Sequence, residues 1–400
     1  MLSVAETPWQ AVSIPVLLLV GLVVTLRLAR RFGVPGMLAT WLYGWHTLFC
    51  GLYFRYSLND NADATLYYLR GLAGEGRLRP GTDGVNWLTG LLADPFGLSY
   101  FGCFLVFNII GMVGLLAFYG ALRTLTAHKT AMARRMALVI VFLPGISFWS
   151  SAIGKDALAF MAAGLAVWAL LEPARRWKTV LLALVLFAFV RPHVGAAFAG
   201  ALAGGLFWSY KARPLVKLAL LAVSVPLAGI TVHLALSYIG IGLSELGAFL
   251  AKRQEIDQSG GASIDLSAMS VPARLFAYLF RPLFFDAAGL NALVVSLENA
   301  LLLVLVVRAL MSLGRNPQAL PAFARTVFVL FVAVLWLVMA NTTGNIGISI
   351  RQKWMFLPML LALALSLWPQ KRPRRAAGSS LINRPAAGAH PRPPETQPST

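Results

Sequence analysis

Apolar runs of about 20 residues recur along most of this chain, and no other feature constrains its fold as strongly. A helix needs about 20 mostly apolar residues to cross the hydrocarbon core of a bilayer. Hydrophobic residues make up 58% of the sequence and charged residues only 12%, about half the charged share of soluble domains. We therefore predict an all-α fold, a polytopic transmembrane helix bundle of about eleven spans. The predicted spans are residues 10–29, 34–54, 99–122, 136–152, 156–171, 179–191, 194–210, 215–239, 289–310, 323–341 and 353–368.

The charged residues are divided unevenly between the two sides of this topology. With the C-terminal tail on the cytoplasmic side, 22 of the 34 lysines and arginines lie on that side, together with only two of the 15 acids, Glu172 and Glu395. The positive-inside rule then predicts a periplasmic N-terminus and a cytoplasmic C-terminus in a bacterial inner membrane. The formal net charge of +19 is explained by this topology, so we expect no nucleic-acid partner.

The predicted domain organisation is one transmembrane domain, residues 1–370, followed by a tail, residues 371–400. The tail is rich in Pro, Ala and Arg, which predicts a disordered, basic cytoplasmic segment. Two long outer loops, at about residues 55–98 and 240–288, contain most of the acids and are expected to hold short interfacial helices and the functional groups. Cys50 and Cys103 fall inside spans and are expected to be packed thiols.

The first outer loop begins with two acids and two tyrosines. Asp60 and Asp63 are three residues apart, so a helix would place both carboxylates on one face, with Tyr67 and Tyr68 on the next turn. Carboxylates that accept hydroxyl protons, beside rings that stack on sugars, are typical of a carbohydrate site, and a carboxylate can act as a general base. We predict catalytic roles for the acids and substrate binding for the tyrosines. The alternative is that the acids only cap a surface helix.

Two further charged motifs follow at span boundaries. Lys155 and Asp156 stand at a helix junction inside the membrane, where a charge is costly unless it is paired. Lys155 could bind a phosphate, and the helix dipole favours Asp156 at a helix start; the alternative is that the two residues pair with each other.

Arg191 lies between two apolar runs, and a guanidinium suits a phosphate or pyrophosphate. His193 is a candidate base or hydrogen-bond donor. The alternatives are that Arg191 extends to lipid headgroups and that His193 is a core residue.

The second outer loop ends in a predicted interfacial helix. Arg274, Tyr278 and Arg281 share one face of this helix, and apolar residues share another. The two arginines would lie at headgroup level and could hold a lipid-linked phosphate, or the segment is a plain membrane-surface helix. Before the helix, a flexible segment with Gly260 and Gly261 is a candidate lid. Farther along, Glu298 lies inside a span and needs a partner such as Arg281 or Arg351.

The last outer segment combines amide, hydroxyl and cationic groups. Asn345, Arg351 and Gln352 are suited to binding phosphate or sugar hydroxyl groups. Lys353 and Trp354 are expected to anchor the start of the last span at the membrane interface.

These segments resemble bacterial surface-polysaccharide polymerases, which assemble O-antigen and exopolysaccharide, and the broader GT-C type membrane glycosyltransferases. The resembling stretches are residues 60–68, 148–156, 191–193, 280–286 and 345–353. The resemblance implies an enzyme that acts outside the cytoplasmic membrane on undecaprenyl-pyrophosphate-linked repeats. It also implies that arginines hold the pyrophosphate and that no metal or other cofactor is required.

The leading hypothesis is therefore a polymerase that transfers a glycan from a polyprenyl-pyrophosphate carrier to an acceptor glycan. We assign catalytic roles to Asp60, Asp63, Arg191, Arg281 and Arg351. The expected partners are the lipid-linked glycan, the bilayer and other polysaccharide-assembly membrane proteins. Three alternatives remain open: a GT-C transferase that uses a polyprenyl-monophosphate sugar, a transporter or flippase of lipid-linked glycan, and a non-catalytic subunit of an envelope complex.

Overall fold

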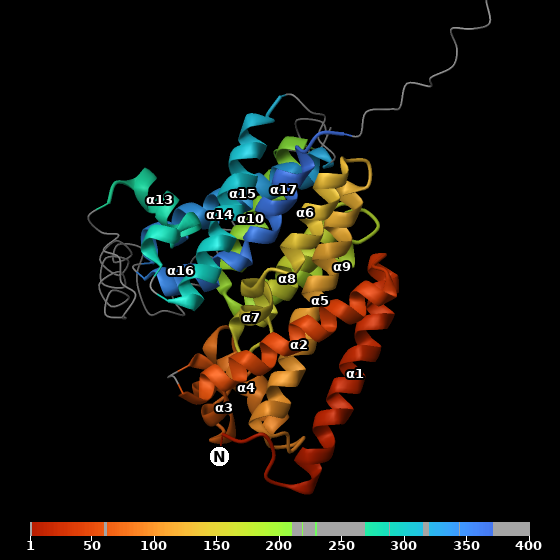
Figure 1. Cartoon of the computed structure of the whole chain (residues 1–400), viewed down its shortest axis with the longest axis vertical. Coiled ribbons are helices and arrows are strands. Elements are labelled where there is room, and N and C mark those ends of the chain that lie inside the picture. Colours follow the sequence, from red (N-terminus) through yellow and green to blue (C-terminus); the bar gives the residue numbers. More distant parts are fainter. Residues whose placement is uncertain are drawn as a thin grey trace, which may run out of the picture.

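The described part of this computed structural model is helical throughout, apart from one isolated bridge between Lys129 and Gln370 (Figure 1). The structure describes residues 2–59, 62–209, 269–287, 289–314, 320–343 and 345–370, and the isolated positions 218 and 229. The α-helices are α1 (Pro8–Phe32), α2 (Gly36–Asn59), α3 (Asp63–Leu72), α4 (Thr82–Ala93), α5 (Tyr100–Thr126), α6 (Ala131–Val141), α7 (Pro144–Ser150), α8 (Lys155–Leu170), α9 (Trp177–Val190), α10 (Pro192–Ser209), α13 (Val271–Phe280), α14 (Leu290–Met311), α15 (Ala322–Thr342), α16 (Ile346–Gln352) and α17 (Leu357–Ser366). Two short 3-10 helices, η2 (Phe284–Asp286) and η3 (Lys353–Met355), complete the described elements.

The all-helical prediction is confirmed, and several helices are long and apolar enough to cross a membrane. In the described residues, five stretches meet this test: α1, α5, α6 with α7, α14 and α15. A sixth is a bent pair, in which α16 and η3 meet α17 at 63°. Helices α2, α8, α9 and α10 overlap four other predicted spans, whereas the predicted span 215–239 lies outside the described residues. The number of eleven spans stays a prediction.

Helices α5 and α8 form the centre of the bundle and touch backbone to backbone. A Cβ atom added at Gly164 would lie 2.1 Å from the carbonyl oxygen of Gly114, and one added at Gly114 would lie 2.6 Å from the Cα of Met161. Small residues allow this close approach, which is how apolar helices gain packing energy where lipid supplies no hydrophobic driving force. Both predicted packed thiols, Cys50 and Cys103, are buried and unpaired.

The segment predicted to be the first outer loop contains a hairpin of α3 and α4. The two helices approach closely at Gly71 and Gly90, where an added Cβ on either would lie 2.7 Å from the backbone of the other. The hairpin docks on the end of α9, since the Gly81 amide donates to the carbonyl of Phe189 at 2.7 Å. The hairpin therefore covers the end of α9 that leads to Arg191.

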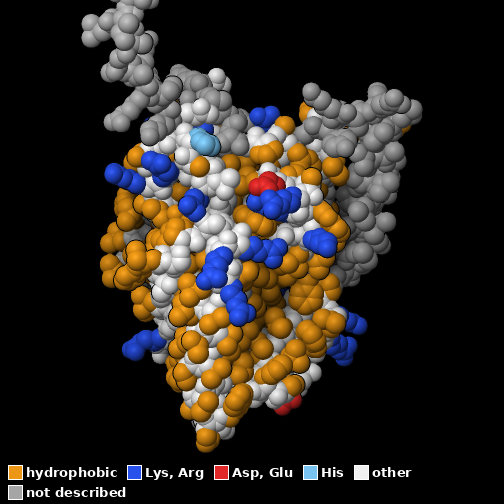
Figure 2. Space-filling model, turned by 90° about the vertical axis from the view of Figure 1, so that its right-hand side faces the viewer, with side chains coloured by type: hydrophobic (Ala, Val, Ile, Leu, Met, Phe, Trp, Pro, Cys, Tyr) orange, Lys and Arg blue, Asp and Glu red, His pale blue; other side chains and the backbone are white. Residues whose placement is uncertain are grey.

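Arginines and tryptophans pair at the end of the bundle that the charge pattern assigns to the cytoplasm. The guanidinium of Arg176 lies 3.8 Å from the ring centre of Trp168, and that of Arg308 lies 4.6 Å from Trp368. Figure 1 places the N-terminus and the end of α17 at opposite ends of the molecule. In Figure 2, most Lys and Arg side chains gather on the upper half of the visible face, above a broad hydrophobic surface. This arrangement agrees with a membrane protein whose positive charges are concentrated towards one end.

Replacing Gly164 with alanine should destabilise the bundle, because its methyl group would overlap the backbone of α5. We expect a cost of about 1–3 kcal/mol, measured as a lower midpoint of thermal unfolding in detergent. Gly200→Ala is the matched control, because an added Cβ there meets nothing within 4 Å. Equal midpoints for the two variants would contradict the close α5–α8 contact.

Candidate functional site

Two arginines and two aspartates from four separate helix ends form one ion-pair cluster. Asp156 lies at its centre, with its Oδ1 3.3 Å from Nη2 of Arg191 and its Oδ2 3.2 Å from Nε of Arg351. Nη1 of Arg351 also donates to Oδ2 of Asp63 at 2.6 Å. The cluster joins residues that are up to 288 positions apart in the chain. We call these four residues the ion-pair cluster.

Local sequence explains why each charge stands where it does. Asp63 and Asp156 occupy the first turns of α3 and α8, where the positive end of the helix dipole stabilises a carboxylate. Arg351 lies in the last turn of α16, which favours a cation. Arg191 follows α9 with extended backbone, because Pro192 begins α10 and the preceding residue avoids helical geometry. Each charge therefore has a favourable helix end as well as an opposite charge.

The cluster is shielded at one side and open at the other. The exposed side-chain fractions are 12% for Arg191, 17% for Asp156, 22% for Arg351 and 47% for Asp63. Partial burial strengthens the attraction between opposite charges, because the surroundings screen them less than water does. Asp63 therefore marks the entrance, and Asp156 and Arg191 mark the interior.

Lys155 adjoins the cluster but does not pair with its neighbour in the chain. Its Nζ donates to the hydroxyl of Thr82, at the start of α4, at 2.7 Å. Asp156 pairs with the two arginines instead, so the alternative of a Lys155–Asp156 ion pair is wrong. The ammonium of Lys155 adds a third cation at the base of the hairpin.

Aromatic side chains form the walls beside the cluster. A small recess is lined by Asp156, Arg351 and neighbouring residues from α7, α8 and η3, namely Trp149, Ser150, Phe160, Trp354 and Met355. The expectation that Trp354 anchors the protein at the membrane surface is wrong, because this side chain is buried. It packs inside the bundle as one wall of the recess.

Several buried groups in or beside the cluster have donors without hydrogen-bond partners among the described residues. The Nε of Arg191 and the hydroxyl of Tyr278 each lack a hydrogen-bond acceptor there. Tyr278 is fully buried and stacks on Phe356, so it does not share an exposed face with Arg274 and Arg281 as predicted. Unsatisfied buried donors are costly, and an anionic ligand is one way to satisfy them.

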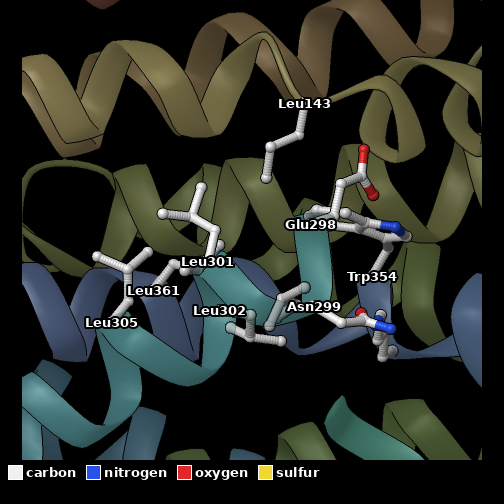
Figure 3. A pocket seen from close by; sticks show the side chains of 10 residues that line it. Leu143, Glu298, Asn299, Leu301, Leu302, Leu305, Trp354 and Leu361 are labelled. Atoms are coloured by element: carbon white, nitrogen blue, oxygen red, sulfur yellow. The ribbon is translucent and has the colours of Figure 1, made fainter. Parts of the chain in front are cut away.

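Another set of polar side chains lies next to the ion-pair cluster (Figure 3). It consists of Glu298, Asn299 and Lys353, and we call it the second polar group. Glu298 accepts a hydrogen bond from the Gly145 amide at 2.6 Å, and Lys353 donates to Asn299 and to the carbonyl of Leu279. Lys353 is buried, so the prediction that it anchors the protein at the interface is wrong. In the described residues, Glu298 forms no ion pair with Arg281 or Arg351, and its carboxylate accepts from the Gly145 amide instead.

This second group lines a small, mostly apolar recess. Figure 3 shows the leucines of the recess at one side and the polar side chains of Glu298 and Asn299 at the other. Trp354 lines both recesses, and Arg351 and Lys353 are only two positions apart. The polar group therefore holds the chain segment that carries Arg351.

Arg281 does not join Arg191 and Arg351, which corrects the expectation that three arginines converge. Its guanidinium binds the carboxylate of Asp286, with Nε 2.9 Å from Oδ2. Asp286 also accepts from the Leu283 amide at 2.9 Å. Hydrogen bonds from Arg281 hold the pKa of the Asp286 carboxyl below its ordinary value. Asp286 is only five residues farther along the chain than Arg281, so the two residues form a local ion pair.

The predicted sugar-stacking tyrosines are packed inside the protein. Tyr68 is buried, and its ring centre lies 4.9 Å from that of Tyr100. Tyr67 is buried against Gly154, just before Asp156. Neither ring presents an open face to a sugar in this state, because helical packing of α3 turns both inward.

The remaining predicted residues lie around the cluster in mostly structural contacts. Asn345 caps α16 by accepting from the Gly347 amide at 2.7 Å. Gln352 accepts from Thr343 at 3.5 Å, and Arg274 donates to the carbonyl of Met269 at 2.9 Å. His193 is exposed in the first turn of α10. Asp60 and the candidate lid before Arg274 lie outside the described residues.

Sequence reasoning missed Tyr53 and Tyr278 as neighbours of the cluster. Tyr53 is buried in α2, with its ring 4.7 Å from Phe148 and 5.7 Å from Trp149. Tyr53 sits in an apolar stretch where an aromatic is ordinary, so nothing in the sequence distinguished it. Tyr278 was noticed only as part of a surface face.

In chemical terms, the guanidinium groups of Arg191 and Arg351 are suited to binding an anion, and the Asp63 carboxylate lies at the more exposed side of the cluster. Guanidinium groups suit phosphate oxygens, and a carboxylate can accept a proton from a hydroxyl. In the described part of the chain, no three His, Cys, Asp or Glu side chains come together as a metal site would need. No protein-family model, curated protein or solved structure matches this chain.

The second polar group should show strong coupling between Glu298 and Lys353. Lys353→Met or Glu298→Gln alone leaves a buried charge without its counter-charge, which costs roughly 3–5 kcal/mol. The double variant removes both charges, so its loss in unfolding midpoint should be smaller than the sum of the two single losses. Additive losses in detergent-solubilised protein would show that the two residues do not stabilise each other.

Proposed function

We propose that this protein is an inner-membrane glycosyltransferase of the polysaccharide-polymerase type. It transfers a glycan from a polyprenyl-pyrophosphate carrier to an acceptor glycan at the periplasmic face. The observation that carries the proposal is the ion-pair cluster, in which Arg191 and Arg351 share Asp156 beneath the more exposed Asp63. Arginines fixed on one carboxylate are preorganised to bind the two phosphates of a lipid diphosphate.

The proposed step is a displacement at the anomeric carbon of the donor glycan. The acceptor hydroxyl oxygen forms a bond to that carbon, and the bond from the carbon to the pyrophosphate oxygen breaks. Polyprenyl pyrophosphate leaves with the bonding electron pair, and the hydroxyl proton passes to a carboxylate. Arg191 and Arg351 stabilise the charge that grows on the leaving group, which lowers the barrier.

The carboxylate that accepts the proton is Asp63 in this proposal. It stands at the open side of the cluster, where an acceptor glycan would arrive from the periplasm. Lys155 supports the phosphates as a third cation, and the buried hydroxyl of Tyr278 and Nε of Arg191 supply further donors. Arg281 has no role in binding the donor in this proposal, because it pairs with Asp286 rather than with the aspartates of the ion-pair cluster.

The apolar helices and the uneven charge distribution support a membrane location for this chemistry. The proposed topology has eleven spans, an outer N-terminus and a cytoplasmic C-terminus, which places the ion-pair cluster on the outer side. Loading of the carrier with its glycan would then occur on the opposite side, and other membrane proteins of polysaccharide assembly would deliver it.

Deleting the gene in its native bacterium should shorten the surface glycan and cause lipid-linked repeats to accumulate. Arg191→Ala and Arg351→Ala should each abolish the long glycan ladder while the protein stays in the membrane, because each removes a fixed positive charge from the leaving-group site. Losses of about 100-fold or more in product are expected for removing such a group. Glycan ladders and extracted lipid intermediates provide the measurement.

Arg77→Ala is the matched control, since Arg77 is an exposed arginine in the loop between α3 and α4. It should leave the ladder unchanged. Unaltered glycan length in the deletion strain, or full activity in both Arg191→Ala and Arg351→Ala, would overturn the proposed function.

A further inference from the structure

Both arginines of the ion-pair cluster are already neutralised in the structure. Arg191 pairs with Asp156, and Arg351 pairs with both Asp156 and Asp63. Two arginines and two aspartates cancel in formal charge. An incoming anion must therefore displace a carboxylate before it can bind Arg351 with full strength.

The two carboxylates are not equally easy to displace. Asp156 bridges two guanidinium groups, is 17% exposed and begins α8, which packs at the centre of the bundle. Asp63 contacts one guanidinium only, is 47% exposed and belongs to the outer hairpin. Exposed ion pairs contribute little to stability, whereas breaking a buried one leaves charges unpaired. The carboxylate that can leave is Asp63.

Resting on the proposed function, we propose that Asp63 occupies the phosphate position on Arg351 in the empty protein, and that the pyrophosphate of the lipid-linked donor displaces it. Asp63 then has two roles. It is a placeholder, because it occupies the position of the donor anion on Arg351 until the donor binds, and it acts as the base once the donor has displaced it. This exchange of anions on Arg351 couples donor binding to the release of the Asp63 carboxylate.

Local charge supports a diphosphate as the displacing anion. Once Asp63 has left, Arg191, Arg351 and Lys155 face Asp156 alone, which leaves two positive charges in excess. A glycosyl polyprenyl pyrophosphate is a diester that carries one negative charge on each of its two phosphates. The charges match, whereas a monophosphate diester would leave one cation without a partner.

The displaced carboxylate gains a chemical role. While Arg351 donates to Oδ2 of Asp63 at 2.6 Å, that oxygen is not available to accept a proton from a hydroxyl group. After displacement, Oδ2 is available to accept the proton of an acceptor hydroxyl at the entrance. Base and donor are thereby assembled together, and the empty protein does not present a free base to water.

The Asp63–Arg351 pair is not needed to hold the hairpin against the bundle. Thr65 donates to the Ser57 carbonyl at 3.1 Å, Gly81 donates to Phe189 at 2.7 Å, and Lys155 donates to Thr82 at 2.7 Å. These contacts attach both helices of the hairpin. Removing the charge of Asp63 should therefore leave the protein folded, which separates the placeholder role from a structural one.

Binding of farnesyl pyrophosphate, a short soluble stand-in for the carrier, tests the inference on purified full-length protein. Asp63→Asn and Asp63→Ala should bind the probe roughly 5- to 10-fold more tightly than the unmodified protein, because the competing charge is gone. The same variants should lose at least about 100-fold in kcat for glycan elongation and show a lower KM for the donor, because the base is missing. Asp63→Glu keeps the charge and should bind the probe like the unmodified protein.

Glu75→Gln is the matched control, since Glu75 is an exposed acid of the same hairpin whose partner is Arg70. It should change neither probe binding nor elongation, and unfolding midpoints show whether each variant is folded. If the unmodified protein binds the probe through Arg351 but the Asp63 variants bind no more tightly, the placeholder is overturned and the proposed function stands. If probe binding does not depend on Arg351 or Arg191 at all, the proposed function itself is overturned.

Discussion

Charges inside a membrane protein must neutralise one another, and the arrangement of this molecule around Arg351 follows from that requirement. A guanidinium removed from water is costly unless it has an acid beside it. Arg351 meets Asp63 from the outer hairpin and Asp156 from the central helix, and Asp156 in turn holds Arg191. These contacts bring together charged side chains from segments far apart in the chain. The same contacts bring two guanidinium groups together beside Asp63, the more exposed of the two acids.

The second polar group meets the same requirement at Lys353, two residues farther along the chain. Lys353 is buried with Asn299 and lies near Glu298, and Glu298 is tied to the backbone at Gly145. An added Cβ at Gly145 would lie 2.4 Å from the Glu298 carboxylate, so a larger residue there would have to push this carboxylate aside. The helix that carries Trp149 and the segment that carries Arg351 are thereby connected through α14. The walls of the ion-pair cluster are held by groups that do not take part in it.

Much of the helical architecture is predictable from the sequence, because apolar runs and charge asymmetry are properties of short segments. That Asp63, Asp156, Arg191 and Arg351 have charged partners was also predictable, since an ionisable residue at a membrane boundary is costly unless it is paired. Which partner each residue takes was not, because pairing depends on contacts between segments up to 288 positions apart. Arg281 was assigned to the site for its charge alone, yet Asp286 is nearer. Tyr68 and Lys353 were placed at the surface by their type, although the fold buries both.

The most direct test of the central claim is a structure of the protein with a non-hydrolysable lipid-pyrophosphate analogue bound in a lipid nanodisc. The account predicts phosphate density within hydrogen-bond distance of Arg191 and Arg351, with Asp156 still bridging the two arginines and the Asp63 carboxylate moved away from Arg351. Phosphate density at Arg281 or at the basic cytoplasmic end, with the ion-pair cluster unchanged, would contradict it.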